Sequence, residues 1–410
     1  MRFARLFFKK KGKKMKIAVL QENLAHGLSI VSRAVSPRAN LPVLANVLVA
    51  AETTNASHEG RLRLSATNLE LGITCWIGAK IEEEGSTTVP ARTFVDLVAT
   101  LPAEQVSLNL NATTQTLNVR CGASNTDIKC IDAQDFPPLP VPEIEGAIQI
   151  NVADLKEMIQ QVVFAASVDE ARPVLMGVLM TMDKDTITMA AADGFRLSVR
   201  KSTLSQAEHS LSPAPQPVTI IIPGRALSEL ARVTSTSLSA GAADGNETIA
   251  MVLPKARGQV IFRVKDVELV SQLIDGAFPD YRQIIPPSYK SRTLISTQAL
   301  LKACKQAEIF AREGSNVARL NIKSAGEPGP GTVKISAQSE ETGSNETVVE
   351  ATIEGVGLLI GFNVKYLREV LEVIKTPNVA LETSTPNAPG VIRPVGDDNF
   401  LHVIMPMTSA

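Results

Sequence analysis

Few residues in this sequence combine the type and the spacing that chemistry requires. Zinc sites and small disulfide frameworks need clustered or paired ligands, and the cysteines and histidines here share no such spacing. The GxxxxGKS/T phosphate cradle, the GxSxG nucleophile turn and the HExxH zinc motif are all missing from the sequence. We therefore expect no catalytic residues, no metal and no cofactor, although folding could still bring distant groups together. The residues concerned are Cys75, Cys121, Cys130, Cys304, His26, His58, His209 and His402.

A binding function is better supported, because the C-terminal end carries an adaptable apolar segment. Met405 and Met407 flank Pro406, and the flexible thioether side chains of methionine suit surfaces that accept varied apolar partners. Aromatic residues make up only 4% of the chain, against 44% for all apolar residues. The core must therefore consist mainly of Leu, Val, Ile and Ala.

The net charge argues against a protein that binds nucleic acid tightly through charge alone. The chain has 41 Lys and Arg residues against 42 Asp and Glu residues, but seven of the basic residues fall within the first 14 positions. The rest of the chain has 34 basic and 42 acidic residues, a net charge of −8. Proteins that hold DNA through many phosphate contacts are normally basic, so any contact with DNA must be local and weak.

The basic head at residues 1–14 lacks the apolar core of a signal peptide. We interpret it as a disordered tail or as an upstream start codon wrongly chosen, with a functional arm as the alternative. No segment approaches the roughly 20 consecutive apolar residues that cross a bilayer. We therefore expect a cytoplasmic protein whose four thiols are reduced.

Three segments with a helical pattern recur along the chain, beginning at Leu20, Asn151 and Ser296. They are 131 and 145 residues apart. In the third segment, apolar residues follow the three-to-four spacing of one buried helical face. Asn151 and Ser296 are suitable N-cap residues, because their side-chain oxygens can accept from free backbone N–H groups.

Strand patterns follow each predicted helix in the same order. A short apolar strand comes first, then a strand–turn–strand unit with alternating polarity, and then a junction from a strand into a second helix. The apolar strands are predicted at 41–52, 172–183 and 315–326, the strand–turn–strand units at 62–77, 187–202 and 333–349, and the junctions at 88–102, 221–235 and 360–374.

These repeats predict an α+β fold built from three tandem copies of one domain, each with two helices packed on antiparallel sheets. Proline-rich segments at 135–143 and 278–288 separate the copies, because proline cannot continue a helix. We place the first repeat at 15–142, the second at 143–286 and the third at 287–410.

Five segments resemble one known family, the beta subunits of bacterial DNA polymerase III, which are sliding clamps. They are VPARTF (89–94), AADGFRLSV (191–199), DGAFPDYRQIIP (275–286), IGFNVKYLREVL (360–371) and VIMPM (403–407). The resemblance covers the chain from Met15. It implies clamp domains arranged in a head-to-tail homodimeric ring, and a non-enzymatic processivity factor that encircles double-stranded DNA without reading its sequence.

The partners that the resemblance implies are the alpha-type subunit of the replicative DNA polymerase, the clamp loader, repair polymerases and ligase-type proteins. No membrane partner is implied, and the expected location is the cytoplasm, at the nucleoid. A second hypothesis from another class is a triplicated adaptor that binds peptides without encircling DNA. An enzyme is the third, and it lacks a coherent candidate site.

Basic residues on the predicted helices and in two loops are implied to face DNA, with ordinary solvated helix surface as the alternative. The loop residues are Arg38 and Arg172, and the principal helix residues are Arg92, Arg225, Lys302 and Lys365. Further helix cations are Arg33, Lys156, Arg232, Lys305 and Arg368.

A cleft that holds Leu- and Phe-containing peptides of client proteins is implied between the second and third repeats. Plain core packing is the alternative for Leu175 and Leu197. Phe195 stands where many members of the family have histidine, so we expect a shifted preference for clients. The residues carried over to the cleft are Leu175, Ala192, Gly194, Phe195, Arg196, Leu197, Pro279, Gln283, Ile284, Val403, Ile404, Met405, Pro406 and Met407.

The resemblance also implies a dimer interface at Ile309 and Phe310, which would pack on the first repeat of the other chain beside residues 126–131. The apolar pair precedes a polar segment, which fits an interface and a core equally well.

Deleting residues 1–14 should leave fold and dimerisation intact, because the repeated pattern starts at Met15. Circular dichroism and native mass of the shortened chain check this. A shortened chain that is monomeric or unfolded, beside a dimeric full chain, would assign the head a structural role.

Overall fold

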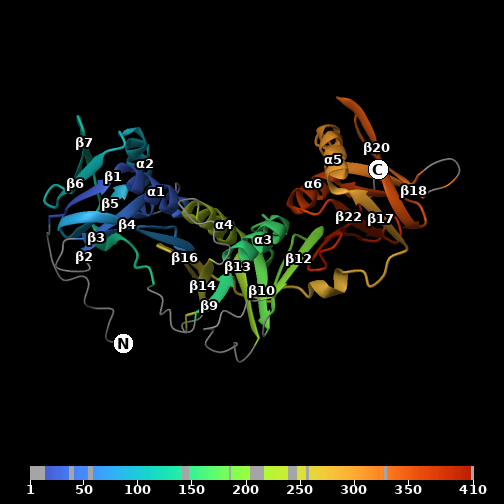
Figure 1. The fold of residues 1–410 in the computed structure, drawn as a ribbon, viewed down its shortest axis with the longest axis horizontal. Coiled ribbons are helices and arrows are strands. Elements are labelled where there is room, and N and C mark those ends of the chain that lie inside the picture. Colours follow the sequence, from blue (N-terminus) through green and yellow to red (C-terminus); the bar gives the residue numbers. More distant parts are fainter. Residues whose placement is uncertain are drawn as a thin grey trace. The chain divides into compact units, whose positions relative to one another are not determined.

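The computed structural model describes residues 14–36, 41–53, 59–140, 147–183, 186–203, 217–238, 247–254, 258–324, 326 and 330–407. Expectations about residues 1–13, Arg38 and residues 408–410 therefore lie outside the described residues. The chain divides into two compact units, whose elements are labelled in Figure 1. The first unit is Met1–Ile150 with Glu229–Gln272, and the second is Asn151–Ser228 with Leu273–Ala410.

The first unit is built on one antiparallel sheet of the order β8-β7-β6-β1-β4-β16-β15-β14-β9, from which β3, β2 and β5 branch at β4. Its helices are α1 (Gln21–Val31) and α2 (Ala91–Thr100), and α1 packs on β4. The strands are β1 (Lys16–Leu20), β2 (Asn46–Thr53), β3 (Glu59–Thr67), β4 (Leu71–Glu83), β5 (Gly85–Pro90), β6 (Gln105–Asn111), β7 (Thr116–Cys121), β8 (Ser124–Lys129), β9 (Ile148–Asn151), β14 (Thr248–Val252), β15 (Gln259–Val264) and β16 (Val267–Gln272).

The second unit is built on a sheet of the order β13-β10-β11-β12-β24-β23-β22-β17-β20-β19-β18-β21. Its helices are α3 (Val152–Val162), α5 (Thr297–Ala311) and α6 (Val364–Val373), while α4 (Gly224–Leu238) contains the division between the units. The strands are β10 (Gly177–Asp183), β11 (Thr186–Ala192), β12 (Arg196–Thr203), β13 (Val218–Pro223), β17 (Ser291–Ser296), β18 (Val317–Lys323), β19 (Thr332–Ser339), β20 (Gly343–Gly355), β21 (Leu358–Asn363), β22 (Asn378–Thr383), β23 (Gly390–Pro394) and β24 (Phe400–Ile404).

The first helix of each repeat begins where the sequence predicts it. The Asn151 side chain accepts hydrogen bonds from the backbone N–H groups of Ala153 and Asp154, and the Ser296 hydroxyl accepts from that of Ala299. These caps satisfy N–H groups that have no partner within the helix. Leu20 offers no such oxygen, and α1 begins without a side-chain cap.

The apolar strands predicted at 41–52 and 172–183 begin later than predicted. Residues 42–45 and 173–176 form short 3-10 turns, η2 (Pro42–Ala45) and η5 (Pro173–Met176), and only then do β2 and β10 start. Proline has no backbone N–H to give to a ladder, and its fixed φ suits the first position of such a turn. The third repeat has no proline here, and its strand β18 needs no turn before it.

Helices α5 and α6 lie side by side over the sheet of the third repeat (Figure 1). Their buried faces, including Leu300, Leu367 and Leu371, pack with Phe362 of β21 in one apolar cluster. Cys304 belongs to the same cluster, and burial raises the pKa of its thiol to about 12. It is therefore a small apolar core residue rather than a reactive thiol. None of the described helices is long and apolar enough to cross a membrane.

Strand pairing continues across the boundaries between repeats. In the first unit, β16 of the second repeat pairs with β4 of the first, with Leu269 opposite Ile73. In the second unit, β12 of the second repeat pairs with β24 of the third, with Leu197 opposite Val403. The repeats therefore share sheets, and the contact units of the folded chain do not coincide with the sequence repeats.

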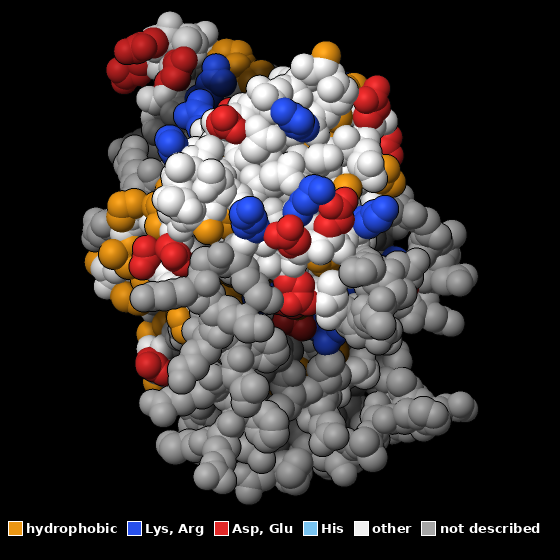
Figure 2. All heavy atoms as spheres, turned by 90° about the vertical axis from the view of Figure 1, so that its left-hand side faces the viewer, with side chains coloured by type: hydrophobic (Ala, Val, Ile, Leu, Met, Phe, Trp, Pro, Cys, Tyr) orange, Lys and Arg blue, Asp and Glu red, His pale blue; other side chains and the backbone are white. Residues whose placement is uncertain are grey.

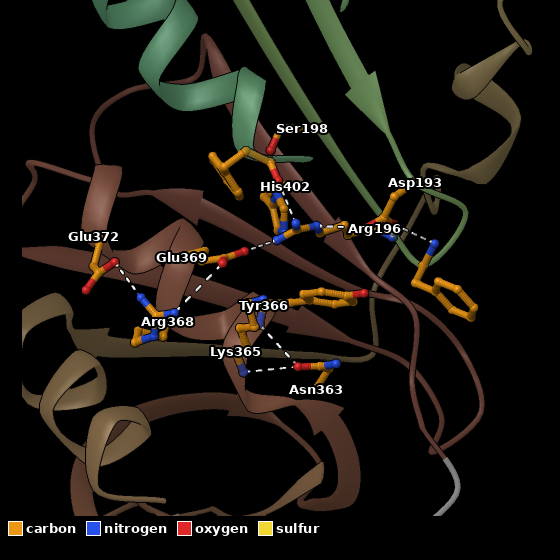
Figure 3. Close-up of polar contacts among 12 residues, drawn as sticks. Asp193, Arg196, Ser198, Asn363, Lys365, Tyr366, Arg368, Glu369, Glu372 and His402 are labelled. Carbon is orange, nitrogen blue, oxygen red and sulfur yellow. Dashed lines mark hydrogen bonds and ion pairs between the residues drawn. The ribbon is translucent and has the colours of Figure 1, made fainter. Parts of the chain in front are cut away.

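A buried ionic cluster joins the second and third repeats inside the second unit (Figure 3). The Arg196 guanidinium donates to Asp193 at 3.0 Å, to the carboxylate of Glu369 on α6, and to the carbonyl of Phe164 at 2.5 Å. It also lies 4.2 Å from the ring centroid of Tyr366, in cation–π contact. Every face of this nearly buried cation is thus occupied by the protein itself.

His402 lies beside this cluster and is completely buried. Its Nδ1 is 2.6 Å from the Ser198 hydroxyl, its ring stacks on Phe164 at 5.4 Å between centroids, and its Nε2 has no hydrogen-bond partner among the described residues. Burial, reinforced by the positive charge of Arg196, holds the pKa of His402 well below its ordinary value. The imidazole is therefore neutral in the folded protein at neutral pH.

We expect the folded second unit to lose stability below about pH 6.5, the ordinary pKa of histidine in an unfolded chain. There the unfolded chain binds a proton that folded His402 rejects, so the free energy of unfolding falls by up to about 1.4 kcal/mol per pH unit. Urea unfolding between about pH 7.5 and pH 5.5 measures this slope, which His402→Gln should reduce. His26→Gln on α1 is the control, and equal slopes in wild type and His402→Gln would refute the assignment.

Candidate functional site

The residues predicted to form the peptide cleft all belong to the second unit, where the pairing of β12 with β24 brings two groups of them together. Arg196 stands opposite Ile404 in this register, and the Met405 backbone N–H extends the pairing by donating to the Phe195 carbonyl at 2.8 Å. Met407 then donates to the carbonyl of Gly361 on β21 at 2.9 Å. The Met-Pro-Met segment is thereby held between the turn that precedes β12 and strand β21.

Three large apolar side chains of the predicted set are exposed. Phe195 is 57% exposed, Ile284 in η6 (Tyr281–Ile284) is 43% exposed and Met405 is 37% exposed. Gly194, Pro279 and Gln283 are also exposed, while Leu175, Pro406 and Met407 are half-buried. We call these nine residues the candidate peptide surface.

Other members of the predicted set lie beneath the surface. Leu197 and Val403 have at most 1% of their area exposed, and both pack with Ala192 and Tyr281 in one apolar cluster. Ile404 is equally buried, in the cluster of the third repeat. Leu197 has no exposed surface in this structure, which fits the alternative of plain core packing.

Arg196 is also placed differently from the sequence prediction. Its side chain is enclosed by the ionic cluster with Asp193 and Glu369 (Figure 3), so its charge is neutralised by the protein itself. Sequence reasoning missed these two acids together with Phe164 and Tyr366. Only the fold brings them together, because Glu369 is 173 residues away from Arg196.

The turn before β12 shows how the chain exposes Phe195. Gly194 has a φ of +94°, which residues with a Cβ rarely adopt. The Asp193 carboxylate accepts from the backbone N–H groups of Phe195 at 2.9 Å and Arg196 at 3.0 Å. A Cβ at position 194 would lie 3.0 Å from the Arg172 guanidinium, so Arg172 borders the candidate peptide surface.

Three of the predicted DNA-facing cations occupy equivalent positions in the three repeats. Arg92, Arg225 and Lys365 are each the second residue of the second helix of their repeat, and all three side chains are exposed. Lys302 is exposed on α5. Arg172 is exposed but paired with Asp169 at 2.9 Å.

Several further helix cations are engaged by nearby acids. Arg368 pairs with Glu308 at 2.5 Å and with Glu372 at 2.8 Å, and Lys305 pairs with Glu372 at 3.0 Å. Arg33 and Arg232 both pair with Glu229, at 3.5 Å and 2.9 Å, while Lys156 is half-buried on α3. Figure 2 shows basic and acidic side chains interspersed on the face that it presents, without a uniformly positive area.

The residues predicted for the dimer interface are accessible on the described part of the chain. Ile309 on α5 is 52% exposed, whereas Phe310 is half-buried against the core of the third repeat. Strand β8 is the end strand of the first sheet and pairs only with β7 among the described strands. Its outer edge can therefore accept another strand.

Models of one family match almost the entire chain in three consecutive segments. The N-terminal, central and C-terminal domains of the DNA polymerase III beta subunit match residues 15–140, 149–280 and 282–408. Each match covers one of the three repeats.

Curated relatives and solved structures agree with these models. The chain is 33% identical over 394 residues to the beta sliding clamp of Synechococcus elongatus, covering 96% of this chain and 99% of the relative. It is 31% identical over 403 residues to that of Staphylococcus aureus, with the same coverage. A Bacillus subtilis DNA polymerase sliding clamp superposes with a TM-score of 0.84 at 28% identity, over 97% of this chain and all of that one.

A Pseudomonas aeruginosa sliding clamp bound to griselimycin gives a TM-score of 0.83 at 27% identity, over 96% of this chain and all of that one. The three family-model matches, the sequence identities and the superpositions therefore agree on one family. The chain belongs to the DNA polymerase III beta subunit family, and it is a DNA sliding clamp.

Proposed function

We propose that two copies of this chain form a head-to-tail ring that encircles duplex DNA and holds the replicative polymerase on it. The observation that carries this proposal is the exposed cation at the same helical position in each repeat: Arg92, Arg225 and Lys365. A closed ring of two chains would present six such cations around its opening. We assign the repeats to 15–142, 143–286 and 287–410, and place the activity in the cytoplasm, at the nucleoid.

A ring retains DNA by topology, so it does not need high affinity. Affinity for DNA grows with the number of phosphates neutralised, and many strong contacts would oppose sliding. The acidic balance outside residues 1–14 and the pairing of Arg368, Lys305 and Arg33 with acids both limit that number. We assign weak DNA contacts to Arg38, Arg92, Arg172, Arg225, Lys302 and Lys365.

The candidate peptide surface is where we expect client proteins to attach. Phe195, Ile284 and Met405 offer exposed apolar area, and Leu175 and Met407 are half-buried. A short client segment binds more tightly when this surface removes its apolar side chains from water. The clients that we propose are the polymerase, the clamp loader, repair polymerases and ligase-type proteins. The dimer interface that we propose includes Ile309 and Phe310.

Retention on DNA should depend on the topology of the DNA. Protein loaded on nicked circular DNA should remain there for far longer than on the same DNA after linearisation, because a ring slides off a free end. Gel filtration of DNA-bound protein, before and after cutting, measures this. Rapid loss from circles, at a rate rising steeply with salt, would indicate ordinary charge-driven binding. Equal retention on both forms would favour an adaptor that does not encircle DNA.

The same assay distinguishes the contribution of phosphate contacts from retention by encirclement. Replacing Arg38 and Arg172 with Glu should make the salt dependence of static binding less steep by up to about 4 in the log–log slope, since two phosphate contacts are lost in each of the two chains. Rings already loaded on circles should persist. Arg282→Glu is the control, since Arg282 is an exposed arginine that also lies near an aspartate, with 3.7 Å between its guanidinium and Asp280.

Removing apolar side chains from the candidate peptide surface should weaken client binding without dissociating the dimer. Met405→Ala combined with Leu175→Ala should cost about 2–4 kcal/mol of peptide affinity, a loss of about thirty-fold or more. Titration of a Leu- and Phe-containing polymerase peptide by calorimetry or fluorescence polarisation measures the loss.

The control for this variant is Val356→Ala, which shortens an exposed apolar side chain outside the candidate surface. Native mass verifies that each variant is dimeric. Unchanged peptide affinity in the double variant would place the client site elsewhere, whereas dissociation into monomers would show that these residues serve assembly.

A further inference from the structure

The second helices of the three repeats share an acidic residue at one position. Asp96, Glu229 and Glu369 are each the sixth residue of their helices α2, α4 and α6. The equivalence is independent of the family resemblance, because it follows from helix starts at Ala91, Gly224 and Val364.

In two of the three repeats, the preceding repeat covers this acid. Glu229 is 9% exposed and pairs at 3.5 Å with Arg33, in the 3-10 turn η1 (Ser32–Ala34) that follows α1. Glu369 pairs with Arg196, which also binds the carbonyl of Phe164 in the 3-10 turn η4 (Val163–Ala165) that follows α3. Arg33 and Phe164 are both the thirteenth residue counted from the start of the first helix.

The corresponding face of α2 has no preceding repeat within the chain. The Asp96 side chain is 72% exposed, and its interaction with Arg92 spans 3.9 Å at the helix surface. The next residue shows the same contrast, because Leu97 is half-buried whereas its counterparts Leu230 and Val370 are at most 1% exposed. The face of α2 that carries Asp96 and Leu97 therefore has the residue types found at the two internal junctions, but no other repeat covers it in the described part of the chain.

The third repeat carries the complementary end. Thirteenth from the start of α5 is Ile309, which is 52% exposed. Arg312 lies three residues further and is exposed, so it shares that face of the helix. The neighbouring Glu313 accepts hydrogen bonds from Ser339 and Thr342, and Lys305 on the preceding turns is paired with Glu372.

We propose that Asp96 is the acid of the junction between subunits, paired there with Arg312 of the partner subunit. Leu97 then packs against Ile309 of the partner subunit. As in the two junctions within the chain, an arginine of one repeat meets the acid of the next, although each of the three arginines comes from a different position. This inference rests on the proposed homodimer and adds a residue pair that the family resemblance did not supply. Opposite charges that meet at a desolvated interface fix its register and strengthen it more than an exposed pair does.

Charge reversal tests the pair. Asp96→Arg alone and Arg312→Asp alone should each weaken the dimer at least about tenfold in dissociation constant, since like charges then meet at both junctions of a ring. An equimolar mixture of the two variants should restore dimers. In such a heterodimer, one junction keeps the native pair and the other carries the reversed pair, so native mass spectrometry should find the mixed species in excess over either homodimer.

Two exposed charges on other elements provide matched controls. Glu70→Arg, in the turn before β4, and Lys290→Glu, just before β17, should leave the dimer unchanged. Circular dichroism establishes that every variant is folded. A monomeric wild-type protein would overturn the proposed ring itself. A dimeric wild type whose single variants dimerise equally well, or variants that fail to recover on mixing, would overturn the Asp96–Arg312 pair while leaving the ring in place.

Discussion

Antiparallel pairing between β12 and β24 is the constraint on which the candidate peptide surface depends. It places Leu197 opposite Val403, with both side chains in the core, and leaves Phe195 and Met405 at the ends of the strands. Side chains alternate between the two faces of a strand, and both faces of this pair are buried, so a slip of one residue would put the polar Ser198 and His402 in the place of Leu197 and Val403. The register that joins the second and third repeats therefore also determines which side chains the candidate peptide surface exposes.

The ionic cluster around Arg196 makes this register specific. Arg196 pairs with both acids, so separating it from either one would leave a single carboxylate beside the cation and break part of a largely buried hydrogen-bonded network. Asp193 links the cluster to the exposed turn, because the same carboxylate accepts from the Arg196 side chain and from the Phe195 backbone N–H. Helix α6, through Glu369, is thus mechanically connected to the apolar surface at Phe195.

Equivalent positions in the three repeats differ in exposure, and the exposed ones indicate where the chain can bind a second copy. Positions such as Glu229 and Glu369 are covered by neighbouring repeats, whereas Asp96 in the first repeat and Ile309 in the third are exposed. A chain of three repeats has two internal junctions and two open ends, and closing them head to tail with a second copy gives a finite ring. The weak and partly neutralised positive charge then leaves such a ring free to slide.

The sequence alone determined the features that depend on local pattern. Spacing and alternation revealed three repeats and their helix–strand order, and the capping chemistry of Asn151 and Ser296 located two helix starts to the residue. Two strands start after 3-10 turns that begin at Pro42 and Pro173, because proline has no backbone N–H for a ladder. The apolar pattern alone did not predict these turns. Only the tertiary structure separated Phe195 and Met405 on the surface from Leu197 and Val403 in the core. Burial depends on strands and helices far apart in the chain, and for the same reason Arg196 met Glu369 only once the chain had folded.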